Sequence, residues 1–140
     1  DLSKFIFDLE ETMRAGPPSV GIAAPQVGRF ERIVIIDVSS KPDIPNHGKL
    51  ILINPKIVSK QGSVVGREGC LSVPDYTGNV MRAEALTLQA LNLVGKTVNY
   101  QMEGFEARAI SHEIDHLEGV LFLDRLVSRR NSLFRRKVYK

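Results

Sequence analysis

The segment His112–His116, which reads HEIDH, constrains the fold of this chain more than any other stretch. Residues four apart lie one above the other on an α-helix, so His112 and His116 present two imidazoles to the same point in space. Two ligands of a metal ion can therefore come from one helical turn. Glu113 lies at the edge of that face, where it can hold a proton. The sequence predicts a metal-binding helix with a general base beside the ion.

The alternative is a surface helix with two solvated histidines. The neighbouring residues argue against it, because Phe105 and Ala109 continue the stripe of the histidines at helical spacing. An adjacent stripe is apolar and consists of Ile110, Ile114 and Leu117. Imidazoles that are buried between apolar residues without partners cost free energy. This context favours the metal site.

Two histidines do not complete a catalytic site, which needs three protein ligands and an open position. The chain offers its single cysteine, Cys70, an acid upstream, or His47 in a loop rich in Pro, Asn and Gly. His47 reads as an ordinary exposed histidine. Cys70 follows a glycine and precedes a short apolar run, as at a strand edge where the backbone can approach a metal closely. A lone cysteine is otherwise a small buried hydrophobe, but beside this helix we favour ligation by Cys70.

The glycine-flanked segment Ser19–Gly28, SVGIAAPQVG, is the third notable stretch. Its small residues Gly21, Ala23 and Ala24 would let a substrate backbone come close, and the amide of Gln26 could donate to a developing oxyanion. The alternative is a tight turn packed against a helix. Taken alone, the segment favours that turn.

The periodicity of the remaining chain predicts one α+β domain over residues 1–140, with mainly antiparallel strands packed around the central metal-binding helix. Helical spacing runs from Leu2 to Met13 and again from Phe105 to His116. A final basic helix is expected in Ser128–Lys140. Short β-branched or alternating runs predict strands at 32–38, 50–58, 85–92 and 97–102, the last two forming a hairpin.

Charge and hydropathy limit the setting of the protein. No apolar run reaches the roughly 18 residues that span a bilayer, and acids stand near the N-terminus where a secretory signal carries positive charge. We therefore expect a cytoplasmic protein without membrane contact, an organelle being also compatible. Ser128–Lys140 carries six of the nineteen Lys and Arg residues and no acid. Such a segment is typical of a solvated helix face, and it could also dock on nucleic acid or an acidic partner.

Three motifs, GIAAPQ, EGCLS and HEIDH, occur together in the order and spacing of the peptide deformylase family, which this chain resembles over nearly its whole length. Members are metal enzymes that remove the formyl group from the N-terminal methionine of new polypeptides and release formate. The resemblance implies the peptide deformylase fold and that activity. It also implies one divalent ion, Fe2+ in the cell, which Zn2+, Ni2+ or Co2+ can replace.

The resemblance also assigns roles to individual residues. The implied metal ligands are Cys70, His112 and His116. Glu113 would be the general acid and base, and Gln26 with the backbone N–H of Leu71 would stabilise the oxyanion. Gly21 would hydrogen-bond the substrate backbone. The implied methionine pocket is lined by Val20, the stem of Glu68, Phe105, Ala109 and the ring of His112.

Two departures from the family pattern stand out. Ser19 occupies a position where the family usually has glycine, and its hydroxymethyl group could narrow the substrate cleft. The chain also starts almost on its first helix, so it is either a shortened member or lacks N-terminal residues. The basic C-terminal helix expected in Ser128–Lys140 resembles the bacterial subclass in which this helix can contact the ribosome.

Two other functions fit parts of the sequence. A metallopeptidase that cuts internal bonds would share the HEIDH helix, but its third ligand usually comes from downstream, where the chain offers Glu118 and Asp124 and no histidine. A non-catalytic RNA or ribosome binder would use the basic segment and a closed structural metal site. Such a site needs a fourth protein ligand, and none is obvious.

Overall fold

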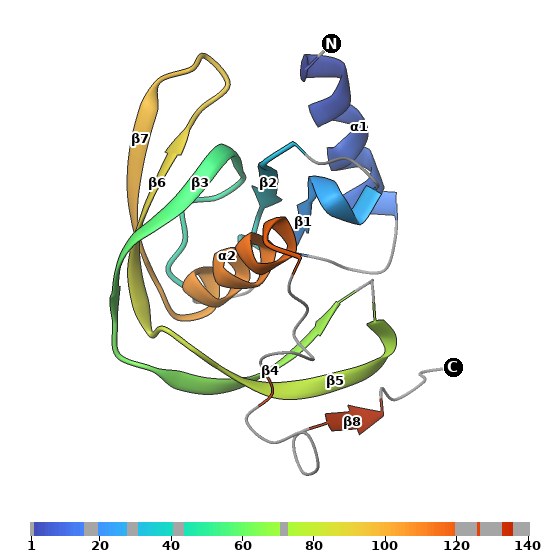
Figure 1. The fold of residues 1–140 in the computed structure, drawn as a ribbon, viewed down its shortest axis with the longest axis vertical. Helices are drawn as coiled ribbons and strands as arrows, with labels where there is room; N and C mark the ends of the chain where they lie inside the picture. Colours follow the sequence, from blue (N-terminus) through green and yellow to red (C-terminus); the bar gives the residue numbers. More distant parts are fainter. Residues whose placement is uncertain are drawn as a thin grey trace.

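The computed structural model describes residues 2–15, 20–27, 31–40, 44–70, 73–119, 126 and 133–135. The side chains of Gln26 and Cys70 lie outside that description, as do Ser19 and Leu71. Within these ranges, two helices and two antiparallel sheets form the fold (Figure 1). The elements are, in chain order, α1 (Leu2–Ala15), β1 (Gly21–Ala23), the 3-10 turn η1 (Ala24–Val27), β2 (Ile33–Ile36), β3 (Leu50–Gln61), β4 (Val64–Cys70), β5 (Val73–Arg82), β6 (Ala85–Leu91), β7 (Thr97–Glu103), α2 (Gly104–Leu117) and β8 (Leu133–Arg135).

Helix α2 lies between the two sheets (Figure 1). The larger sheet has the order β1-β2-β3-β6-β7, and the smaller one the order β4-β5-β8. All pairings between neighbouring strands are antiparallel. The α+β class with mainly antiparallel strands is therefore confirmed, and the HEIDH segment lies in α2. Among the described residues, no helix has the length and apolar character that a membrane span requires.

Strand β2 contributes side chains to two hydrophobic clusters, one on each face of the larger sheet. Its residues Ile33–Ile36 are all buried, because successive side chains point to opposite faces and both faces are covered. Ile33 and Ile35 join the cluster under α1, with Ile6, Leu9 and Met13. Val34 and Ile36 join the cluster under α2, with Leu52, Leu88 and Ile110. The sheet thus holds α2 through a continuous apolar layer.

The two helices and the hairpin follow the periodicity of the sequence. The predicted first helix is α1, and the predicted central helix is α2. The hairpin of β6 and β7 is also confirmed. Its turn is closed by Asn92, whose Oδ1 accepts the backbone N–H groups of Val94 and Lys96, both at 3.0 Å. Gly95 takes a φ of +81°, which favours glycine.

The hairpin of β4 and β5 was only partly foreseen, as a strand near Cys70. Val64 pairs with Arg82 and Gly69 with Thr77, after which the register changes so that Cys70 pairs with Val73. Glycines and charged residues interrupt the alternation in both strands, so periodicity gives a weak signal there. This hairpin nevertheless places β4 beside α2.

The helix predicted over Ser128–Lys140 is wrong for Leu133–Arg135. These residues form β8, which pairs with Tyr76–Gly78 of β5. The other edge of β5 is already paired with β4, and an open edge presents a row of backbone groups that a further strand can satisfy. The remainder of the predicted helix lies outside the described residues. Tertiary pairing has therefore overridden the local preference of this short segment.

Candidate metal centre

Helix α2 begins and ends at residues with special backbone conformations. Glu103 is extended at its N-cap, and Gly104 has a φ of +57°. Gly119 follows the C-cap with a φ of +76°, so glycine ends the helix as predicted. Between these points the helix buries an apolar face made by Ala107 and Ile110. The rest of its circumference is available to polar side chains.

The two histidines of α2 converge as their spacing predicts. His112 Nε2 and His116 Nε2 are 3.2 Å apart, and the rings meet edge to face at 74°. Both side chains are buried. A tetrahedral ion bound at 2.0–2.1 Å by two nitrogens holds them about 3.3 Å apart. The separation of the two Nε2 atoms therefore fits a shared divalent metal.

Glu68 of β4 fixes the orientation of the His112 ring. Its Oε1 lies 2.9 Å from His112 Nδ1. Burial alone would raise the pKa of Glu68, but hydrogen bonds from Arg82 and His112 and the charge of Arg82 lower it from 4.5 to about 2. An ionised carboxylate only accepts, so Nδ1 carries the hydrogen and Nε2 offers its lone pair toward His116. A metal ligand needs this tautomer.

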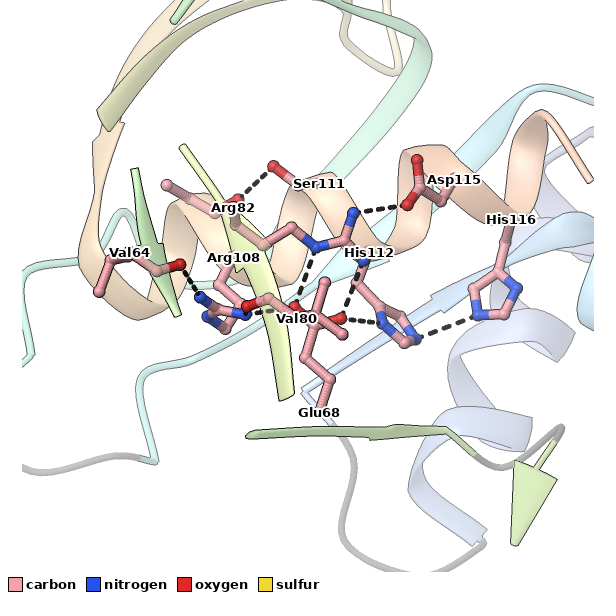
Figure 2. Close-up of polar contacts among 10 residues, drawn as sticks. Val64, Glu68, Val80, Arg82, Arg108, Ser111, His112, Asp115 and His116 are labelled. Atoms are coloured by element: carbon pink, nitrogen blue, oxygen red, sulfur yellow. Dashed lines mark hydrogen bonds and ion pairs between the residues drawn. The ribbon is translucent and has the colours of Figure 1, made fainter. Parts of the chain in front are cut away.

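A charged cluster of four residues, Glu68, Arg82, Arg108 and Asp115, backs His112 (Figure 2). Arg82 donates Nε to Glu68 Oε2 at 2.9 Å and Nη2 to Oε1 at 2.8 Å, and its Nη1 reaches Asp115 Oδ2 at 2.5 Å. Burial lowers the pKa of Arg82, but Glu68 and Asp115 raise it to above the ordinary value. Arg108 Nη1 donates to Glu68 Oε2 at 2.6 Å. Two cations and two anions therefore balance beside the histidines.

Glu113 lies on the other side of the histidine stripe, against β1. Its side chain is buried. A Cβ added to Gly21 would lie 2.7 Å from Glu113 Oε2 and 3.0 Å from its Cγ. Position 21 must therefore be glycine if this carboxylate is to keep its place beside the histidine pair.

The other expected site residues lie in or next to β1, β4 and α2. Gly21 is in β1, and Val20 directly precedes that strand and is half-buried. Phe105 is half-buried in the first turn of α2, and Ala109 is buried one turn later. Glu68 has a role that the sequence did not reveal, because it is tied to Arg82, Arg108 and His112.

The side chains of Gln26 and Cys70 lie outside the described residues, and so does Leu71. The backbone nevertheless limits where Cys70 is. Strand β4 contacts His112 through Glu68 and ends two residues later at Cys70. Because a strand advances about 3.3 Å per residue, this backbone is close to the histidine pair.

His47, the alternative third ligand, is engaged elsewhere. Its Nδ1 lies 2.6 Å from Glu106 Oε1, and its backbone N–H donates to Oε2 at 2.7 Å. Its ring also meets Tyr100 edge to face, with centroids 5.1 Å apart. Glu106 precedes His112 by six residues, which turns it about 240° around the helix. The histidine is exposed as predicted, but it pairs on a different face of α2 from the metal centre.

The cluster behind His112 contains three residues that sequence reasoning missed, namely Arg82, Arg108 and Asp115. Arg108 and Asp115 stand four residues before and three after His112, on the same side of the helix. That spacing was a usable signal. Their partners come from β4 and β5, and no local pattern could have identified them.

Comparisons with known proteins agree with this geometry. The family model described as polypeptide deformylase matches residues 1–132. A peptide deformylase 2 of Vibrio cholerae is 45% identical over 135 residues, covering 96% of this chain and 78% of the relative. A peptide deformylase of Thermodesulfovibrio yellowstonii is 39% identical over 137 residues, covering 98% and 81%. The crystal structure of a peptide deformylase from Thermotoga maritima has a TM-score of 0.82 and 37% identity, covering 91% of this chain and 82% of that one. A class I type b peptide deformylase from Acinetobacter baumannii, solved with Met-Ala-Ser bound, has a TM-score of 0.79 and 40% identity, covering 89% and 80%.

Proposed function

Because this chain belongs to the polypeptide deformylase family, we propose that Cys70, His112 and His116 hold its metal and that Glu113 moves the proton of its reaction. The protein is a metal-dependent hydrolase that removes the N-terminal formyl group of nascent polypeptides and releases formate. The observation that carries the site is the 3.2 Å separation of His112 Nε2 and His116 Nε2 on α2.

The donor set suits the expected ions. His112 and His116 would bind through Nε2, and Cys70 would bind through its sulfur as the third ligand. Thiolate and imidazole together suit ferrous iron or zinc better than magnesium or calcium. We propose Fe2+ as the metal in the cell, with Zn2+, Ni2+ or Co2+ as substitutes. When bound, the divalent ion supplies Lewis acidity and makes water acidic enough to react near neutral pH.

Glu113 is the residue that transfers the proton. Its carboxylate takes the proton from the water that attacks the formyl carbon, and then gives it to the leaving amine. The products are formate and a free N-terminus. The closeness of Gly21 to the Glu113 carboxylate supports this role, because glycine at position 21 leaves the room that this carboxylate occupies.

The oxyanion formed during attack needs donors that are already in position. Gln26 and the backbone N–H of Leu71 take this role in the proposal. In sequence Gln26 belongs to η1, which follows β1 directly, and Leu71 follows Cys70. Losing one such donor typically costs about 3 kcal/mol of transition-state stabilisation.

The substrate lies along β1 in this proposal, with its backbone hydrogen-bonded to Gly21. Its methionine side chain occupies a pocket lined by Val20, Phe105, Ala109, the stem of Glu68 and the ring of His112. Phe105, Ala109 and His112 support this pocket, because they share one side of α2 at positions i, i+4 and i+7. A formyl group is the smallest acyl group, so a close-fitting site excludes acetylated chains.

The proposal also covers the partner and the cellular compartment of the reaction. The substrate is made on ribosomes, and Ser128–Lys140 concentrates six of the nineteen Lys and Arg residues. We propose that this basic segment contacts the ribosome and that the protein works in the cytoplasm. Strand β8 lies within the segment, so the contact would not use one continuous helix.

The test is formate release from formyl-Met-Ala-Ser by protein purified and loaded with Fe2+ without oxygen. The sequence of the peptide follows the Met-Ala-Ser bound to the Acinetobacter baumannii relative. We expect turnover of the formyl peptide, none of acetyl-Met-Ala-Ser and no cleavage of casein. Casein cleavage without formate release would instead identify an endopeptidase.

A further inference from the structure

Arg108 occupies a binding site for its guanidinium that is built by both strands of the β4–β5 hairpin. Its Nη1 donates to Val80 O at 3.0 Å and its Nη2 to Val64 O at 2.7 Å. Nη1 also donates to Glu68 Oε2 at 2.6 Å. The side chain starts on α2, so one residue joins the helix to both strands (Figure 2).

Gly66 makes room for this guanidinium. A Cβ added at Gly66 would lie 2.9 Å from both Arg108 Cζ and Nε, and 3.1 Å from Nη2. Real Cβ atoms essentially never lie under 3.0 Å from a neighbour, so the Arg108 guanidinium would have to shift away from its hydrogen bonds to Val64 and Val80. The arginine and the glycine therefore form one structural unit, and either can be changed to disturb it.

The contact with Glu68 leads from Arg108 to His112. The Glu68 carboxylate receives four donors: Arg82 Nη2 and His112 Nδ1 at Oε1, and Arg82 Nε and Arg108 Nη1 at Oε2. A carboxylate has about four acceptor sites, so these donors saturate it. Arg82 sets the plane of the carboxylate, and Arg108 takes the site on Oε2 that Arg82 leaves. Oε1 is then held in a position where its second hydrogen bond comes from the Nδ1–H of His112.

We propose that Arg108 is a positioning residue for His112, which acts through Glu68 to fix the Nδ1–H tautomer and thereby raises the affinity of the centre for a divalent metal. The proposal rests on the proposed function, because it takes His112 as a metal ligand. It differs from a purely structural role in one respect. A structural clamp stabilises the fold, whereas a positioning residue changes the state of one imidazole.

The first measurement reads the tautomer without metal. Side-chain 15N NMR of the metal-free protein distinguishes the two neutral tautomers, and the chain has only three histidines to assign. The spectra are compared at about pH 8.5, two units above the reference histidine pKa of about 6.5. We expect His112 to be the Nδ1–H tautomer in the wild type and a mixture of tautomers in Arg108→Met.

The second measurement is the dissociation constant of Co2+, followed by its visible absorption. Arg108→Met should weaken binding about tenfold, the lower end of the range for groups that orient metal ligands. Gly66→Ala should do the same without removing any charge, and Arg108→Lys should lie between. Arg67→Met is the matched control, because Arg67 is exposed on β4 and bonds Asn79 and Thr77. It should leave the dissociation constant unchanged.

A double-mutant cycle with Glu68→Gln tests whether Arg108 affects Co2+ affinity through Glu68. If Arg108 acts through Glu68, its removal changes Co2+ affinity little once Glu68 is already replaced. An equal effect in both backgrounds would overturn the proposal, as would unchanged Co2+ affinity in Arg108→Met and Gly66→Ala. If Arg108→Met does not fold, Arg108→Lys and Gly66→Ala make the same comparison.

Co2+ binding and formate release together show whether the role of Arg108 or the proposed function fails. Wild type that binds Co2+ in an Arg108-dependent way but releases no formate from formyl-Met-Ala-Ser would overturn the proposed function alone. Wild type that releases formate and loses no Co2+ affinity in the variants would overturn the role of Arg108 alone. Wild type that measurably binds neither Co2+ nor Fe2+ would overturn both.

Discussion

The two faces of α2 are buried by different interactions. One face packs Ala107 and Ile110 into the apolar layer of the five-stranded sheet. The other sets Arg108 and Asp115 into ion pairs with residues of β4 and β5. Both faces are closed to solvent. The two faces therefore do not differ in burial. They differ in whether their interactions depend on direction.

Hydrophobic burial has no preferred direction, so the apolar face holds α2 against the sheet without fixing its rotation closely. Hydrogen-bonded ion pairs are directional, and those to Glu68 tie one side of the helix to one position on β4. The apolar face thus holds α2 against the sheet, and the charged face orients the His112 ring. Substitutions on the two faces should fail in different ways.

The largest effect is expected from a residue that supports neither face. Glu113→Gln removes the proposed proton carrier while keeping the shape, so formate release should fall by about 10²–10⁴-fold. Metal content and the free energy of unfolding should stay near those of the wild type, as measured by elemental analysis and urea titration. Near-normal turnover would remove Glu113 from the proposed reaction.

The faces themselves are compared by Arg82→Met and Ile110→Val. Removing Arg82 leaves Glu68 and Asp115 buried without their shared cation, and should lower the free energy of unfolding by about 3–5 kcal/mol. Ile110→Val removes one buried methylene and should cost about 0.5–1.5 kcal/mol. Urea titration of the metal-free proteins measures both. Equal losses would mean that the charged face is not the more sensitive one.

Acid should weaken the charged face selectively. The pKa of Glu68 is about 2 in the folded protein and 4.5 as the ordinary value. Its stabilisation is therefore complete above pH 4.5 and is lost as the pH falls toward 2, a loss of roughly 3 kcal/mol. Urea titrations of the metal-free protein between these pH values measure it. Glu68→Gln should show a flatter profile over the same range, and an identical profile would contradict the assignment.

The smallest effect is expected for an exposed ion pair between Arg32 and Glu118, the C-cap residue of α2. Arg32 Nη1 and Glu118 Oε1 are 2.9 Å apart, with side chains 42% and 56% exposed. Such pairs contribute about 0–1 kcal/mol, so Arg32→Ala should hardly change the urea midpoint. A loss as large as that of Arg82→Met would show that solvent exposure does not separate the two kinds of ion pair here.

Local patterns predicted the parts of the fold that local interactions form. Helical spacing located α1 and α2, and alternation with the turn at Asn92 located the β6–β7 hairpin. The long β4–β5 hairpin was largely missed, because Gly66, Gly69 and Gly78 dilute its alternation. The helix expected at Leu133–Arg135 was wrong, because the edge of β5 determines that strand.

The candidate site divides in the same way. The convergence of His112 and His116 followed from their spacing, whereas the partners of Glu68 are distant in sequence and could not be read from it. The roles of Cys70, Gln26 and Leu71 stay predictions, as does the single domain over residues 1–140. Charge pairing between remote residues is specified by the fold, and only the fold could reveal it.

A crystal structure of the Zn2+-loaded protein, with anomalous data at the zinc edge, tests the proposed centre most directly. We expect one ion about 2.0–2.1 Å from the Nε2 atoms of His112 and His116, and about 2.3 Å from Cys70 Sγ. An ion bound by both histidines while Cys70 Sγ stays out of bonding distance would contradict the proposed ligand set.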